Sequence, residues 1–239
     1  VNNYKNQIEL AVKHFQQAVN IDSTYSNPWH NLGYINMILY KNYELAALQY
    51  SKSIEVDSTA AASFLNRGIS NYYIGNYKKA LQDFKNYLNK NPNIKDKELD
   101  KAYVFTAKSK LELGDTLGST EYYLLAFENL KIENLNKAVL TDIKKHFIAV
   151  KRFDLAIRVS DLEISFNPDI DAPYVDKGNF YLLTGDTVKA IENWEIAFEK
   201  FNGNYNIGMT LHQYFTTKGN IEKANYYYNK AVHYRQTHP

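Results

Sequence analysis

The segment that decides the fold of this protein is GNYKKALQDF, at residues 75–84. Gly75 can adopt the left-handed backbone that ends an α-helix, and Asn76 can cap the start of the next one. In that next helix, a small residue such as Ala80 lets two helix backbones approach closely, and the ring of Phe84 fills the gap to a neighbouring unit. The segment therefore predicts two antiparallel helices joined by a short turn.

A pattern of a small residue, an aromatic residue and a second small residue recurs at seven places along the chain, six of which have an aromatic residue at the centre. Its central positions are Phe15, Tyr50, Phe84, Tyr123, Ser160, Trp194 and Tyr228, spaced 35, 34, 39, 37, 34 and 34 residues apart. A small residue also recurs in the preceding helix, as Gly33, Gly68, Ala107 and Gly178. A period of this length is typical of stacked repeats that bury one continuous core. The aromatic residues, 15% of the chain, are then expected to fill the interfaces between repeats.

Two segments carry a resemblance to a known family. WHNLG at residues 29–33 is similar to the first-helix motif of the tetratricopeptide repeat, and residues 75–84 are similar to its second-helix motif. The resemblance covers essentially the whole chain. It implies an all-α fold, a right-handed α-solenoid (superhelix) of stacked antiparallel helix pairs.

We expect one tetratricopeptide-like solenoid over residues 1–239. It consists of a half repeat at 1–23, with its second helix only, and repeats at 24–58, 59–92, 93–131, 132–168, 169–202 and 203–236. The first helices of the repeats (A helices) are expected at about 26–40, 60–74, 97–114, 134–149, 171–184 and 205–218. The second helices (B helices) are expected at about 43–56, 77–90, 116–130, 153–166, 187–201 and 221–236, with an extra one at about 4–21.

The repeat spacing is irregular at two connections. The spacing of 39 adds five residues at Asn93–Asp100, and the spacing of 37 adds three near Glu128–Lys137. One interpretation is an extra first turn of the following A helix, at Asp96–Glu98. The other is a bend or flexible joint that separates residues 1–92 from residues 138–239.

The repeat at 138–168 departs furthest from the pattern. Lys144 and Glu163 occupy positions that are usually small, and Ser160 stands where the aromatic residue is expected. A small hydroxyl at that position should leave the interface looser. We therefore expect this unit to open first, which hydrogen exchange measured along the chain tests, since uniform protection of all repeats would contradict it.

The composition narrows the classes of partner. The chain has 28 Lys and Arg against 26 Asp and Glu, and the cations do not cluster, so we expect no nucleic acid partner. Apolar runs such as Tyr34–Tyr40 are far shorter than the ~20 residues of a membrane-spanning helix, so we expect no direct membrane insertion by this segment. The sequence does not distinguish a cytoplasmic from a periplasmic location, and a targeting signal, if there is one, lies outside this chain.

No motif for catalysis or cofactor binding occurs. The absence of cysteine excludes thiol nucleophiles and Cys-ligated metal. The six histidines are dispersed over different repeats, and the glycines do not form a phosphate-binding loop. We therefore expect no catalytic residue, no cofactor and no metal.

The family resemblance implies that set positions of the A helices face a concave groove that receives a peptide or a partner protein. In this chain those positions give Asn27, His30, Asn31, Tyr34, Asn66, Tyr73, Lys101, Lys108, Asp176 and Asn179. Asn31 and Asn66 share one position in successive repeats, where a carboxamide either pairs with a peptide backbone or only solvates the groove. Tyr72 and Tyr73 either anchor a partner or serve the core of their own repeat. The carboxylate clamp of chaperone-binding members is excluded, because only two of its five positions match.

The expected function is a non-enzymatic protein–protein interaction scaffold that binds a peptide or partner protein in this groove. The alternative is a soluble regulatory or assembly domain of a larger enzyme or lipoprotein, with or without a membrane anchor, whose other domains precede Val1. The extra helix at 4–21 has no A helix before it, so further repeats before Val1 are also expected. Self-association through uncapped ends is a third possibility.

Overall fold

The computed structural model describes residues 2–90, 98–130, 135–201 and 204–237, with side chains described from residue 5. All regular structure within these residues is helical, which confirms the expected all-α class. The chain divides into two compact units, unit 1 (Val1–Asn129) and unit 2 (Leu130–Pro239). The assignment of one solenoid to residues 1–239 stays a prediction.

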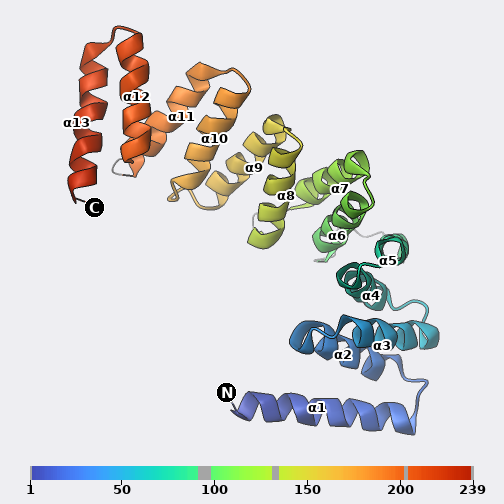
Figure 1. Cartoon of the computed structure of the whole chain (residues 1–239). Helices are drawn as coiled ribbons and strands as arrows, with labels where there is room; N and C mark the ends of the chain where they lie inside the picture. The colour runs from blue at the N-terminus through green and yellow to red at the C-terminus, as the bar shows by residue number, and fades with distance from the viewer. Residues whose placement is uncertain (1, 91–97, 131–134, 202–203, 238–239) are drawn as a thin grey trace. The chain divides into compact units, whose positions relative to one another are not determined.

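Unit 1 consists of helices that pair with their neighbours in chain order (Figure 1). Its elements are α1 (Asn2–Ile21), α2 (Ser26–Ile35), the π-helical turn η1 (Asn36–Tyr40), α3 (Tyr43–Val56), α4 (Ala61–Ile74), α5 (Tyr77–Lys90), α6 (Leu99–Glu112) and α7 (Thr116–Asn129). These bounds confirm the expected helix pairs. The A helix expected at 26–40 is divided into α2 and η1, which the sequence analysis did not predict.

Unit 2 continues the alternation of A and B helices. Its elements are α8 (Lys137–Ala149), α9 (Phe153–Phe166), α10 (Ala172–Leu183), α11 (Thr187–Lys200), α12 (Tyr205–Thr217) and α13 (Ile221–Thr237). Each lies within a few residues of its predicted bounds.

The turns inside the repeats have the predicted chemistry. Gly75, Gly114, Gly185 and Gly219 all have positive φ angles, and in the last three turns the next residue caps the following helix. The side chains of Asp115, Asp186 and Asn220 accept hydrogen bonds from backbone N–H groups of the B helix at 2.9, 3.1 and 3.1 Å. This geometry satisfies backbone donors that have no partner inside the helix.

The glycines of the A helices are contact points for the aromatic residues of the B helices. A Cβ atom added to Gly68 would lie 2.5 Å from the ring of Phe84, and one added to Gly33 would lie 2.9 Å from the ring of Tyr50. Both rings are fully buried. The small residue and the ring therefore form one contact, as the repeat pattern predicts.

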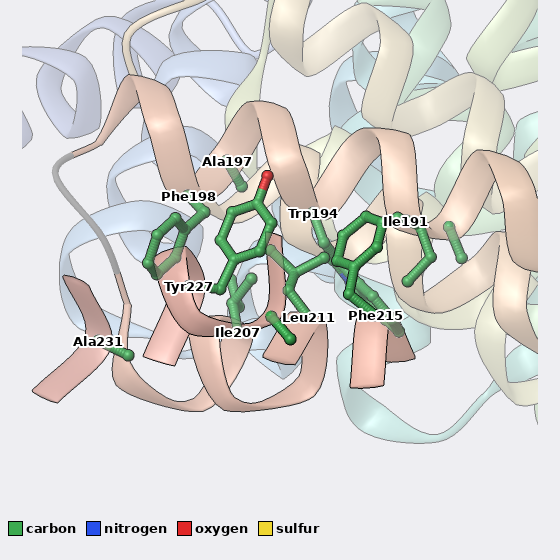
Figure 2. Close-up of a cluster of buried hydrophobic side chains, with 11 residues drawn as sticks. Ile191, Trp194, Ala197, Phe198, Ile207, Leu211, Phe215, Tyr227 and Ala231 are labelled. Atoms are coloured by element: carbon green, nitrogen blue, oxygen red, sulfur yellow. The ribbon is translucent and has the colours of Figure 1, made fainter. Parts of the chain in front are cut away.

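The prediction is wrong for Tyr228, whose side chain is 43% exposed. Its ring lies 5.2 Å from that of His212, but no described helix follows α13 to cover the other side. The preceding residue, Tyr227, is buried instead (Figure 2). Its ring centroid is 5.3 Å from Phe198 and 5.6 Å from Phe215, so α13 is held by a ring outside the repeat pattern.

The irregular repeat of unit 2 replaces the glycine–ring contact by an ion cluster. Ser160 is fully buried, and its Oγ has no hydrogen-bond partner among the described residues. Lys144 stands where Gly68 and Gly178 stand in their repeats, and its Nζ contacts Glu163 Oε2 at 2.7 Å and Asp176 Oδ2 at 2.5 Å. Because the residue at the aromatic position is small, the lengthened side chain of Lys144 has room.

The two interpretations of the first long connection stay open. Asp96 and Lys97, on which the extra helical turn depends, lie outside the described residues, while Glu98 is in a turn and α6 begins at Leu99. The boundary between the two compact units falls at Asn129 and Leu130, in the second long connection.

Candidate functional site

Unit 1 contains a groove along its A helices, with a volume of about 400 Å³. Residues of α2, η1 and α4 form much of it, residues at the start of α6 close one side, and Tyr43 of α3 adds one ring. The groove is lined by His30, Tyr34, Met37, Ile38, Lys41, Tyr43, Ala62, Leu65, Asn66, Ile69, Tyr73, Glu98, Lys101 and Phe105. Three successive A helices thus contribute to one surface.

Five of the ten predicted groove residues line this cavity together. They are His30, Tyr34, Asn66, Tyr73 and Lys101. Asn27 is exposed and Asn31 is partly buried, and neither lines the cavity. Lys108 also lies outside it, with its Nζ 5.3 Å from the centroid of the Phe105 ring. Asn66 is therefore placed in the groove without Asn31.

Aromatic rings form a continuous shelf in the groove. Tyr73 stacks on Tyr43 with ring centroids 4.6 Å apart, and its ring lies 5.9 Å from that of Phe105. Tyr73 is 52% exposed. Tyr72 instead packs against the core cluster of unit 1 and is partly buried. Tyr72 therefore serves the core, whereas Tyr73 is exposed in the groove and its role as an anchor for a partner stays a prediction.

The groove is lined by one imidazole, two ammonium groups and one carboxylate, those of His30, Lys41, Lys101 and Glu98. His30 Nδ1 is 2.8 Å from Ser63 Oγ, and burial lowers the pKa of His30, so the imidazole is neutral at pH 7. Lys101 Nζ pairs with Glu98 Oε2 at 2.6 Å. Lys41 is exposed and makes no ion pair within the described part of the chain. The groove therefore carries a surplus of positive charge.

Ile38, Lys41 and Tyr43 line the groove although the sequence pattern did not predict them there. The family positions assume a regular A helix, whereas η1 widens the helix after Ile35. The available signal was a count: Gly33 and Tyr50 are 17 residues apart, but Gly68 and Phe84 are 16 apart.

The two predicted residues of unit 2 do not share a site. Asp176 lines a smaller cavity of about 260 Å³ that also contains Lys144 and Glu163. Asn179 is exposed and lies outside it. The carboxylate of Asp176 is already paired with Lys144, so this side chain holds α10 to α8.

The described residues show neither a metal site nor a membrane-spanning helix. No group of three or more His, Asp or Glu side chains there is arranged to hold a metal ion. None of the helices found in those residues has the length and hydrophobicity needed to span a bilayer.

Comparison with known proteins gives one sequence relative and many structural ones. No family model matches the chain. A DnaJ homolog subfamily C member 7 homolog of Dictyostelium discoideum is 21% identical over 220 residues, which cover 81% of this chain and 41% of that protein. The chain thus spans about two fifths of the length of this curated relative.

The solved structures agree in fold. The C-terminal part of a TPR repeat-containing protein from Cytophaga hutchinsonii has a TM-score of 0.67 at 15% identity, covering 96% of this chain and 91% of that chain. YrrB, described as a TPR protein with an unusual peptide-binding site, has a TM-score of 0.57 at 17% identity, covering 78% and 91%. A tetratricopeptide repeat protein from Parabacteroides merdae has a TM-score of 0.52 at 16% identity, covering 97% and 93%. The chain therefore has the tetratricopeptide-repeat fold that its sequence pattern predicts.

Proposed function

We propose that this protein is a non-enzymatic scaffold that binds a peptide segment of a partner protein in the groove of unit 1. The observation that carries the proposal is the groove itself, in which three successive A helices converge on a half-exposed aromatic shelf. Repeat folds of this kind present extended surfaces to partners, and YrrB is described as binding a peptide.

The chemistry of the lining fits a peptide better than a small polar metabolite. Tyr34 and Tyr73 offer large contact areas that lose little side-chain entropy on binding. Asn66 supplies both a donor and an acceptor for a peptide backbone. Leu65 and Ile69 are buried beneath them and give the floor a fixed shape.

Replacing Tyr73 by Ala should remove the centre of the aromatic shelf. Peptides selected from a random dodecapeptide phage library on the wild-type protein should bind this variant at least about tenfold more weakly, because buried aromatic contacts dominate such interfaces. Fluorescence anisotropy with the synthetic peptides measures the loss.

Tyr228→Ala is the matched control, since this tyrosine is similarly exposed but lies on α13 in unit 2. It should leave peptide affinity unchanged, and both variants should melt within a few degrees of wild type. Selected peptides that bind Tyr73→Ala as tightly as wild type would refute the groove as the binding site.

The same peptides test whether Asn31 and Asn66 bind a peptide backbone. Asn66→Ala should weaken binding by about three- to tenfold, because a backbone hydrogen bond is lost. Asn31→Ala should have little effect, since Asn31 does not line the cavity. If both variants bind normally, the asparagines only solvate the surface.

The alternative, a regulatory or assembly domain of a larger protein, has one supporting observation. The curated relative is more than twice as long as the part of it that this chain matches. A gene that encodes a catalytic or membrane-spanning domain before Val1 would support this alternative.

A further inference from the structure

One A helix of unit 1 contains a residue more than the repeat requires. Phe84 lies 16 positions after Gly68, Trp194 lies 16 positions after Gly178, and each ring contacts that glycine. Tyr50 lies 17 positions after Gly33, yet this glycine contacts its ring in the same way. The extra residue therefore lies between Gly33 and Tyr50 and does not disturb their contact.

The structure accommodates this residue in the π-helical turn η1. Asn36 Nδ2 donates to the carbonyl of Leu32 at 3.0 Å and to Gln49 Oε1 at 2.9 Å, and both side chains of this amide pair are buried. Lys41 ends the turn at φ 55°, in the left-handed region where four other A helices end in glycine. Such turns are uncommon in helices and concentrate at functional sites.

The π-helical turn and the residue that ends it contribute three side chains to the groove. Each residue advances a helix by about 100°, so every residue after the insertion is rotated by that angle relative to a regular A helix. Met37, Ile38 and Lys41 all line the cavity, and Ile38 is 39% exposed.

The charges beside this turn are complementary to an acidic partner. Among the described lining residues are two lysines, Lys41 and Lys101, and one carboxylate, Glu98. Lys101 already pairs with Glu98, so Lys41 supplies the surplus cation at the end of η1. An anion that binds there would not have to displace an existing ion pair.

We propose that η1 is a binding element that makes the groove selective for a peptide in which an apolar side chain is followed by acidic residues. The apolar side chain would contact Ile38 and Tyr73, and the acidic side chains would pair with Lys41. This inference rests on the proposed function of the groove.

Deleting Leu39 tests the role of the turn. Leu39 lies in η1 but does not line the cavity, so its deletion restores the regular spacing without removing a groove side chain. The matched control is Leu39→Ala, which removes the same side chain and keeps the turn. The probes are two fluorescein-labelled nonapeptides, Gly-Ser-Gly-Phe-Asp-Asp-Gly-Ser-Gly and its counterpart with Lys-Lys in place of Asp-Asp.

The wild-type protein and Leu39→Ala should bind the acidic probe at least about tenfold more tightly than the basic one. The deletion should lose this preference while melting at the same temperature or above it, because a regular helical turn replaces the uncommon π-helical one. A deletion variant that folds and keeps the preference would overturn the inference.

Lys41→Gly gives an independent test if the deletion does not fold. Glycine accepts the left-handed backbone at this position, so the variant loses the cation without losing the turn. It should bind the acidic probe at least about fivefold more weakly and the basic probe no more weakly. An unchanged ratio of the two affinities would overturn the inference, whereas the proposed function fails separately if Tyr73→Ala leaves peptide binding intact.

Discussion

Phe84→Ala should lower the free energy of unfolding of this protein by about 3–5 kcal/mol. The ring of Phe84 is fully buried, and its edge lies against Gly68, where no side chain can move into the space left by its removal. The loss therefore combines the transfer of a large apolar group with an unfilled cavity. Urea denaturation followed by circular dichroism measures it as a shift of the midpoint.

Tyr228→Ala is the control for this prediction, because Tyr228 occupies the same repeat position as Phe84. Its ring is 43% exposed and lies against His212 instead of a glycine. The substitution should cost less than about 1 kcal/mol. Equal losses for the two variants would show that repeat position, and not burial, determines the contribution of the ring.

Lys144→Ala should destabilise unit 2 by about 1–3 kcal/mol. Its ammonium group is shared by Glu163 and Asp176, and its side chain is only 12% exposed. Removing it leaves two neighbouring carboxylates without their counter-ion, which is strongly unfavourable where water is excluded. The expected loss is below that of a fully buried pair, because the side chain of Asp176 is 41% exposed and stays partly hydrated.

The neighbouring Lys145 provides a control for the loss of charge alone. It is exposed and makes no ion pair among the described residues, so Lys145→Ala should change stability by less than about 0.5 kcal/mol. Hydrogen exchange should show that Lys144→Ala exposes α8, α9 and α10 and not unit 1. Equal effects of the two lysine variants would contradict the role of the ion cluster.

A triple variant tests whether the ion cluster replaces the usual contact. Lys144→Gly, Ser160→Phe and Glu163→Ala together restore the small residues and the ring of the other repeats. The triple variant should be more stable than Lys144→Ala, since a ring again fills the interface. Failure to recover stability would show that the backbone of this repeat does not fit the regular contact.

The helices and turns of this fold could be predicted from the sequence because each follows from a local rule. Gly75 and its three equivalents end helices at positive φ, and the Asp or Asn after three of them caps the next helix. The small and aromatic positions locate the interfaces, because only a residue without a large side chain admits a ring at that distance.

The groove was predicted only in part, because its composition depends on how three A helices pack against one another. Tyr34, Asn66 and Tyr73 line the cavity at the expected family positions, but Asn31 does not. A single additional residue between Gly33 and Tyr50 is a weak signal in a sequence. Whether it lengthens a loop or widens a helix depends on the path of the chain between Gly33 and Tyr50, whose contact is fixed by packing.

The sequence by itself determined the helices, their order and the positions where they meet, since period, turn residues and side-chain size are local properties. Only the tertiary structure decided what each position does. In the structure Tyr227 is buried and Tyr228 is not, Lys144 pairs with two carboxylates, and Lys41 lines the groove. Burial and charge pairing depend on residues distant in sequence. The contribution of a side chain to stability, and the groups it pairs with, are therefore set only when the neighbouring helices are in place.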